Sequence, residues 1–266
     1  MNIMKKVGIL TIVVITILVI IQFNKKNSDE AVLRVGVEVA YMPWIGINSN
    51  GEVEGFEIDI ANKICEKLNR KCEFIKQDWD GLIPALLNNK YDVIMAGMTV
   101  TNKRREKIDF SHGYADTGVA IASLSLEKSN SMEKLLKNIE GKKLGVQMGT
   151  VSAKWADKTL KNTIIRSYGT QEELNIDLLN GRIDAGINDT SVWTALQQTN
   201  SDIKIVSPIL TAKDDPLFGE GVGVGIKKGR TKLLDEINKA LYEISDEGSL
   251  SNLATKWFGY DASLPQ

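Results

Sequence analysis

The stretch QDWDGLIPALLNNKYDVIMAGMTVTNKRREKIDFS, residues 77–111, carries the signals of a helix, a strand and a second helix in direct succession. Asp80 can accept a backbone hydrogen bond as the N-cap of a helix over 82–88. The apolar run at 91–96 predicts a buried strand, and Thr101 can cap the short helix that follows it. Helices that alternate with buried strands at this spacing are typical of α/β sheets.

The same alternation continues on both sides of this stretch. Upstream, we expect a strand at 31–39, a helix at 56–69 and a strand at 71–76. Downstream, the pattern restarts. It predicts strands at 142–147, 163–168, 184–188, 202–207 and 222–227, and helices from Thr150 to about 160 and at 172–180, 190–198, 231–245 and 249–257.

Two such series in one chain predict an α/β protein with two lobes, each a mainly parallel sheet flanked by helices. We expect one lobe to comprise residues 29–119 and 222–266, and the other to comprise 120–221. The chain would cross between them at a hinge of two segments, near 118–122 and 218–223. Ligands of such sheets bind beyond the carboxyl ends of the strands. The polar loops at those ends are 38–44, 78–79, 96–101, 147–152 and 188–189, and a cleft between the lobes would collect them.

Residues 1–28 differ from the rest of the chain. Two lysines precede an almost unbroken apolar run at 7–23, and two more follow it. This order is typical of an export signal, so we expect the protein outside the cytoplasm, in the periplasm or at the cell surface. No small-x-small motif closes the run, and the run is just long enough to span a bilayer. The segment is therefore either a cleaved signal or a retained membrane anchor.

The composition excludes several classes of function. The chain has 266 residues, 43% of them hydrophobic, which suffices for a substantial core. Without residues 1–28, which contain four Lys and no acid, 29 basic residues stand against 34 acidic ones, and the net charge is −5. This balance gives no reason to expect nucleic acid as a partner. His112 is the only histidine and no G-x-S-x-G motif is present, so we expect no metal, no cofactor and no Ser-His-Asp triad.

Several segments resemble the amino-acid-binding family of periplasmic solute-binding proteins of ABC transporters. The matching segments are GFEIDIANKICEKL at 55–68, the stretch 77–111, GKKLGVQMGT at 141–150, LLNGRIDAGINDT at 178–190 and DEGSLSNLATKWFG at 246–259. VGVEVAYMPW together with QDWDG is most similar to the branch that binds lysine, arginine, ornithine, histidine or opines. The resemblance implies the type II two-lobed fold, a small amino-acid ligand, a membrane permease as partner and a monomeric protein.

A pair of cysteines also fits this branch. Cys65 and Cys72 form a disulfide candidate because the chain is exported, and the alternative is two free buried thiols. The branch has a cysteine pair that resembles this one, so the resemblance favours the disulfide.

The resemblance assigns most of the ligand contacts. Arg104 would bind the ligand carboxylate, and Asp189 would bind the ammonium group. The alternative for Asp189 is a plain N-cap of the next helix, and both roles can hold together. Ala96 and Gly97 stand where several relatives have Ser, so one side-chain contact is absent there, while the Gly97 carbonyl can still accept a hydrogen bond. Further hydroxyl or N–H groups for the ligand's charged ends come from Thr99, Thr150, Val151 and Ser152.

The ligand side chain is expected to lie near Glu38, Tyr41 and Trp79, with Gln147 at its distal end. Glu38 would pair with an ammonium or guanidinium, while Tyr41 and Trp79 would clamp the alkyl stem. Trp44 either contacts the ligand or only packs, and Glu57 is expected on the surface at a helix start. Three alternatives stay open: a ligand-sensing domain, a binder of glutamine or another polar amino acid, and a prephenate-type dehydratase on the same fold.

Overall fold

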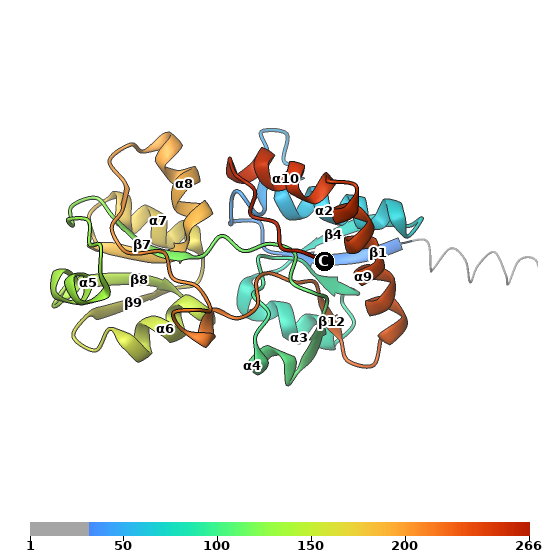
Figure 1. The fold of residues 1–266 in the computed structure, drawn as a ribbon, viewed down its shortest axis with the longest axis horizontal. Coiled ribbons are helices and arrows are strands. Elements are labelled where there is room, and N and C mark those ends of the chain that lie inside the picture. Colours follow the sequence, from blue (N-terminus) through green and yellow to red (C-terminus); the bar gives the residue numbers. More distant parts are fainter. Residues whose placement is uncertain (1–31) are drawn as a thin grey trace, which may run out of the picture.

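Two five-stranded sheets form the centres of two lobes in the computed structural model, which describes residues 32–266 (Figure 1). The first sheet has the order β4-β1-β5-β12-β6 and the second β11-β7-β10-β8-β9. The first contains β1 (Val32–Val37), β4 (Lys71–Lys76), β5 (Val93–Ile94), β6 (Ile108–Phe110) and β12 (Gly225–Lys227). The second contains β7 (Val119–Ser123), β8 (Lys143–Gln147), β9 (Ile164–Tyr168), β10 (Ala185–Asp189) and β11 (Lys204–Ile205).

The two-lobed α/β fold with mainly parallel sheets is confirmed, and each sheet is mixed because one of its five strands runs opposite to the other four. Strand β1 is parallel to β4 and β5, and β8 is parallel to β9 and β10. Strands β12 and β7 are antiparallel to both of their neighbours. These two strands directly follow the segments in which the chain passes from one lobe to the other. Each of them therefore begins at the edge of its sheet that faces the cleft and runs opposite to its neighbouring strands.

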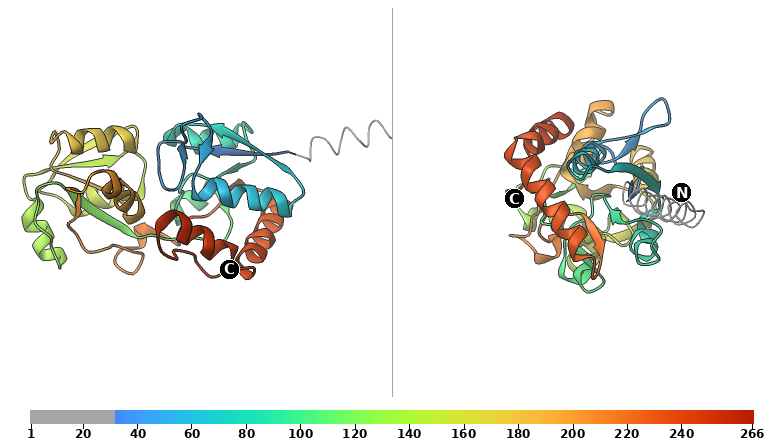
Figure 2. Two further views of the ribbon diagram at one scale, coloured as in Figure 1. Left: turned by 90° about the horizontal axis from the view of Figure 1, so that it is seen from above. Right: turned by 90° about the vertical axis from the view of Figure 1, so that its right-hand side faces the viewer.

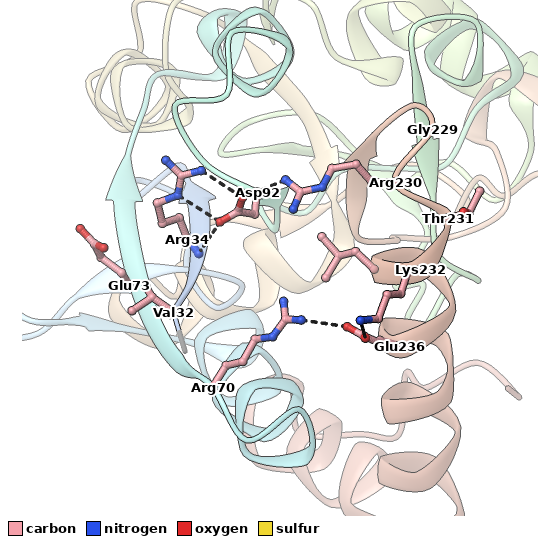
Figure 3. A pocket seen from close by; sticks show the side chains of 11 residues that line it. Val32, Arg34, Arg70, Glu73, Asp92, Gly229, Arg230, Thr231, Lys232 and Glu236 are labelled. Atoms are coloured by element: carbon pink, nitrogen blue, oxygen red, sulfur yellow. Dashed lines mark hydrogen bonds and ion pairs between the residues drawn. The ribbon is translucent and has the colours of Figure 1, made fainter. Parts of the chain in front are cut away.

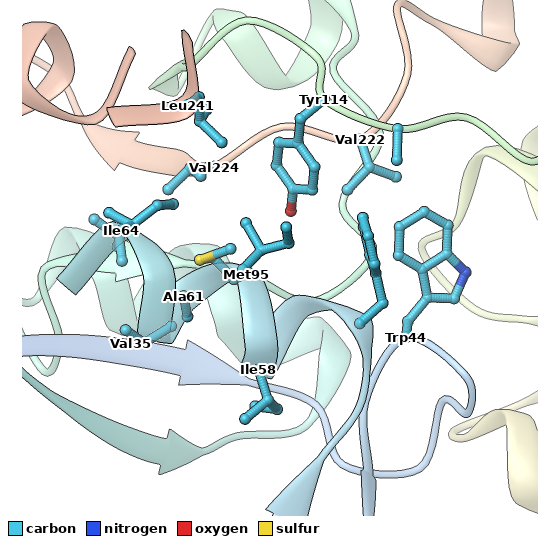
Figure 4. Packing of buried hydrophobic residues seen from close by; sticks show 14 of the residues in the cluster. Val35, Trp44, Ile58, Ala61, Ile64, Met95, Tyr114, Val222, Val224 and Leu241 are labelled. Atoms are coloured by element: carbon cyan, nitrogen blue, oxygen red, sulfur yellow. The ribbon is translucent and has the colours of Figure 1, made fainter. Parts of the chain in front are cut away.

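Helices cover both faces of the first sheet. Val93 and Ile94 are adjacent in β5 and point to opposite faces, as strand geometry requires. Val93 belongs to the core that includes Tyr114 and Leu241 (Figure 4). That core packs α2 (Phe56–Lys67), α9 (Thr231–Asp246) and α10 (Ser249–Phe258) on one face, while α3 (Leu82–Leu87) covers the other. The remaining elements of this lobe are the hairpin of β2 (Gly46–Ile47) and β3 (Val53–Glu54), the 3₁₀ turn η1 (Trp79–Gly81) and α4 (Asn102–Arg105).

The second lobe repeats this layering. In β7, Val119 and Ile121 join one core, while Ala120 and Ala122 join the core on the opposite face. The first core packs α5 (Met132–Ile139), α6 (Val151–Thr159) and the turn η2 (Pro216–Phe218) on the sheet. The second packs α7 (Gln171–Leu179) and α8 (Thr190–Thr199). Figure 2 shows the two lobes lying end to end along the long axis of the molecule.

The chain crosses between the lobes twice. The first crossing joins β6 to β7, and the second joins η2 to β12. The crossings run side by side, because the Tyr114 N–H donates to the Val222 carbonyl and the Val222 N–H donates to the Ala115 carbonyl, both at 2.8 Å. The second crossing coincides with the predicted segment 218–223. The predicted first crossing, 118–122, lies mostly within β7, where pairing with β10 fixes the backbone, so the connecting segment precedes it.

Two local predictions have opposite outcomes. Cys65 in α2 and Cys72 in β4 are joined by a disulfide, with their Cα atoms 5.8 Å apart, as predicted. Asp80 does not cap α3, because it lies inside η1 and the N-cap position falls to Gly81, which has no side chain to accept the bond. Within residues 32–266 no helix combines the length and apolarity needed to cross a bilayer. The predicted export signal or anchor at 1–28 lies outside the described residues.

Candidate functional site

A cleft between the lobes brings together eleven of the twelve residues that we predicted to contact a ligand. The exception is Ala96, which lies in the core beside α3. Asn188, which lies in the predicted cleft loop 188–189 but was not among the predicted ligand contacts, also lines the cleft, and its place directly before Asp189 at the end of β10 was the available signal. The lining residues are Glu38, Tyr41, Trp79, Gly97, Thr99 and Arg104 from the first lobe and Gln147, Thr150, Val151, Ser152, Asn188 and Asp189 from the second.

Arg104 is a buried cation at one end of this cleft. Thr101 caps α4 as predicted, since its hydroxyl accepts the Arg104 N–H at 3.3 Å. This short helix aims the guanidinium inward, where only 7% of the residue is exposed. There Nη1 donates to the Thr99 carbonyl at 2.7 Å, and Cζ lies 5.1 Å from the centre of the Trp79 ring. Burial lowers the pKa of Arg104 to about 10, so the group stays charged at neutral pH.

The second lobe presents the start of helix α6 to the same cleft. The Thr150 hydroxyl accepts the Ala153 N–H at 3.0 Å and donates to the Gln147 carbonyl at 2.8 Å. This hydroxyl is therefore engaged in the helix cap, whereas the prediction allowed either the hydroxyl or the N–H of Thr150 as the ligand donor. The first-turn N–H groups of Val151 and Ser152 belong to the positive end of the helix, which favours an anion. Together with Arg104, this helix start makes one end of the cleft suited to a carboxylate.

Asp189 and Tyr41 join the two lobes across the cleft. The Tyr41 hydroxyl lies 2.6 Å from Asn188 Oδ1 and 2.9 Å from Asp189 Oδ2 and can donate to one of them at a time. Asp189 occupies the N-cap position of α8, yet its side chain makes no capping bond, so its carboxylate is turned to the cleft. Burial raises the pKa of Asp189 to about 7. A nearby ammonium group would restore its charge.

Glu38 is a second buried acid in the cleft. It follows β1, and only 5% of it is exposed. Gln147 Nε2, from the other lobe, donates to Glu38 Oε1 at 2.7 Å. Burial raises the pKa of Glu38 to about 7, against the opposing effect of this hydrogen bond. Glu38 and Gln147 are thus paired directly across the cleft, and a ligand placed between them would exchange this bond for its own.

Trp44 packs and does not line the cleft. Its ring is fully buried against Phe56 and Phe258, with ring centroids 5.6 Å and 4.9 Å away. Its Nε1 donates to Ser191 Oγ, in the other lobe, at 3.0 Å. Of the two roles considered for Trp44, the structure has packing, with an added hydrogen bond between the lobes.

Glu57 is fully buried, which corrects its expected place on the surface. Its carboxylate accepts hydrogen bonds from the Gly97 N–H and from the Tyr114 hydroxyl. Burial raises the pKa of Glu57 to about 7. The sequence did contain a signal, because 57 lies on the same helical stripe as Ile60 and Ile64. Glu57 thereby fixes the backbone of Gly97, in the cleft, and the side chain of Tyr114, in the first crossing between the lobes.

Gly97 is the position in the cleft that most clearly requires a glycine. Its φ is 61°, in the left-handed region. A Cβ atom there would lie 2.8 Å from Tyr41 Cε1. The structure therefore explains the glycine at position 97, because the aromatic ring of Tyr41 occupies the space that a larger residue would need.

Comparison with known proteins agrees with this arrangement. Residues 33–260 match the family described as bacterial extracellular solute-binding proteins, family 3. The L-arginine-binding protein of Pseudomonas aeruginosa is 32% identical over 97% of this chain and 98% of its own length. The octopine-binding periplasmic protein of Rhizobium meliloti is 34% identical over 89% and 93% of the two chains. The histidine-binding periplasmic protein of Escherichia coli K12 is 34% identical over 86% and 88%.

Solved structures of amino-acid-binding proteins are also similar to this chain. A periplasmic binding protein of Salmonella typhimurium with high arginine specificity has a TM-score of 0.79 at 26% identity, covering 85% of this chain and 99% of its own. An ancestral arginine-binding protein bound to arginine has a TM-score of 0.76 at 37% identity, covering 86% and 99%. An ancestral amino acid-binding protein, a precursor of cyclohexadienyl dehydratase, has a TM-score of 0.74 at 31% identity, covering 88% and 98%. The chain thus belongs to family 3 of the bacterial extracellular solute-binding proteins.

Proposed function

We propose that this protein captures an amino acid with a cationic side chain, arginine in the first place, and delivers it to the permease of an ABC transporter. The observation that carries the proposal is the charge pattern of one closed cleft. Arg104 contributes one positive charge, and Glu38 and Asp189 contribute one negative charge each when ionised, so the site sums to −1. Arginine, with one carboxylate and two cationic groups, sums to +1 and matches these three charges.

The proposed pose follows the order of these groups. The ligand carboxylate faces Arg104 and the N–H groups at the start of α6. The ammonium group faces Asp189, with the Gly97 carbonyl and the Thr99 hydroxyl as further acceptors. The guanidinium reaches Glu38, and the alkyl stem lies between Tyr41 and Trp79, whose rings can stack on it. Gln147 then hydrogen-bonds the distal end of the ligand.

Binding would hold the lobes in this closed arrangement because each lobe supplies part of the site. Arg104 and Glu38 belong to the first lobe, and Asp189 and Gln147 belong to the second. A ligand that contacts both favours the closed arrangement by its differential affinity. The lobe boundaries at 119/120 and 221/222 stay a prediction, as does the monomeric state. Outside the cytoplasm, residues 1–28 would serve either as a cleaved signal or as an anchor.

Two other functions are kept as alternatives. Glutamine is one, because the arginine-binding ancestor has also been solved in complex with glutamine. A dehydratase is the other, because one structural neighbour is the precursor of such an enzyme. An enzyme of that kind needs a general acid. Of the two acids that line the cleft, Asp189 faces the ligand's ammonium group in the proposed pose, which leaves Glu38 for this role. Turnover of prephenate by the purified protein would support the dehydratase.

A thermal-shift screen tests the ligand class. The protein is incubated with the standard amino acids, ornithine, citrulline and opines. A ligand at about 100 times its dissociation constant stabilises the fold by about 2.7 kcal/mol. Citrulline is the matched control, because it has nearly the shape of arginine and lacks the charge. We expect arginine to give the larger shift. Equal shifts with both, or a preference for glutamate, would contradict the cationic-ligand proposal.

A further inference from the structure

One end of the first lobe gathers basic residues from four separate segments. Strands β1, β4 and β5 are parallel and begin at this end, where Val32 of β1 pairs with Lys71 of β4. Strand β12 is antiparallel to β5, so it ends here, at Lys227. The chain also enters the described structure here (Figure 1). The segments are 32–34, 68–73, 88–92 and 227–232, which we call the basic end.

The basic end differs sharply in charge from the rest of the protein. It contains eight basic and two acidic residues, and a third acid just outside it, Glu236, pairs with Arg70, so this group has a net charge of +5. Residues 29–266 together have 29 basic and 34 acidic residues, or −5. The remainder therefore has a net charge of −10. The basic residues are Arg34, Arg70, Lys71, Lys90, Lys227, Lys228, Arg230 and Lys232, and the acids are Glu73, Asp92 and Glu236.

Ion pairs hold this surface in a fixed shape. Arg34 and Arg230 both contact Asp92 at 3.0 Å, and Arg70 contacts Glu236 at 3.0 Å (Figure 3). Between the two groups lies an open pocket of about 720 Å³. Lys232 lines this pocket, and the exposed Lys71 and Lys228 are next in the chain to the lining residues Arg70 and Gly229. The long helix α9 starts at the pocket with no acid in its first turn. The positive end of that helix adds to the same field.

We propose that the basic end rests on the anionic phospholipid headgroups of the membrane surface. Two observations point to this partner. The surface is cationic on a protein that is otherwise acidic, so headgroups would attract this end and repel the other. In addition, only residues 24–31 separate the basic end from the apolar run at 7–23. Eight residues extend at most about 28 Å, so a retained run would keep this end within reach of the bilayer.

Lysine footprinting of the full chain tests the proposal. The protein is reconstituted into nanodiscs made of phosphatidylglycerol or of phosphatidylcholine, and exposed lysines are acetylated and quantified by mass spectrometry. We expect Lys71, Lys228 and Lys232 to react about tenfold more slowly on the anionic discs, and high salt to abolish the difference. Lys128, Lys142 and Lys213 are exposed in the other lobe and serve as internal controls, which should react equally on both.

A charge-reversal variant completes the test. Replacing Lys71, Lys228 and Lys232 by Glu should make the labelling of Lys90 equal on the two kinds of disc. Reversing Lys128, Lys142 and Lys213 instead should leave the difference intact, and unchanged ligand-induced stabilisation would show that both variants fold. Equal labelling of the wild type on both lipids would overturn the proposal. Full protection by inorganic phosphate on the neutral discs would also overturn it, because the pocket would then be a site for a free anion.

Discussion

Replacing Glu38 by Gln tests the charge that we assign to the side-chain end of the cleft. The amide has nearly the size of the carboxylate, and its oxygen can still accept the bond that Gln147 Nε2 donates over 2.7 Å. The change therefore removes the charge and keeps the packing. A hydrogen bond to a charged group contributes about 1.5–3 kcal/mol, and a guanidinium can make two of them with one carboxylate. We expect arginine binding to weaken by about 2–4 kcal/mol, which is roughly 30- to 1,000-fold.

The same variant should change how binding depends on pH. Burial raises the pKa of Glu38 to about 7, and a guanidinium favours its ionised form. Arginine affinity in the wild type should therefore fall as the pH drops below 7. The pKa of Asp189 is also raised to about 7, so some dependence remains in the variant. Glu38→Gln should reduce by about one the number of protons released when arginine binds at pH 6.

Calorimetry measures both effects. Titrations with arginine, citrulline and glutamine in two buffers of different ionisation enthalpy give the affinities and the number of protons released. Citrulline and glutamine should bind the variant as well as the wild type or better, because Arg104 and Asp189 are unchanged. If arginine bound the variant as tightly as it binds the wild type, Glu38 would not contact the ligand side chain.

Three further predictions follow from other contacts. Arg104→Ala should weaken every amino-acid ligand by about 2–4 kcal/mol without changing their order, since the carboxylate loses its partner, and wild-type affinity in calorimetry would remove Arg104 from the site. Replacing Cys65 and Cys72 by Ser should lower the free energy of unfolding in urea by about 2 kcal/mol, and an unchanged midpoint would refute this. The pKa of Glu57 is raised from 4.5 to about 7, so its contribution to ligand-free stability should decline as the pH rises through that window. Glu57→Gln should flatten this part of the stability profile, and an unaltered profile would speak against its burial.

The sequence predicted the positions that depend on local signals. Thr101 marked the start of α4 and thereby placed Arg104, and the polar residues after Val37 and Ile187 marked strand ends that meet at the cleft. Such signals lie within a few residues of the feature they predict. The burial of Glu57 was also available locally, from its place on the stripe of α2, but an acid in the first turn of a helix is usually exposed.

The direction of strands was not available from local signals. Strands β7 and β12 are antiparallel to their neighbours because of the path the chain takes between the lobes. No residue pattern within either strand indicates that path. The helix α5 was missed although Ser131 caps it, since its exposed residues obscure a short apolar stripe. The bonds of Tyr41 to Asn188 and of Gln147 to Glu38 join residues more than 100 positions apart, which only the folded chain brings together.

Selection of a cationic side chain by the charge of this cleft is tested most directly by the affinities of the wild-type protein for arginine and citrulline. The two ligands share the α-carboxylate, the α-ammonium and nearly the whole side chain, so Arg104, Asp189 and the aromatic clamp contact both alike. By the estimate made for Glu38, calorimetry at pH 8 should show arginine binding about 30-fold tighter or more. Equal affinities would show that the cleft recognises shape and the zwitterion alone.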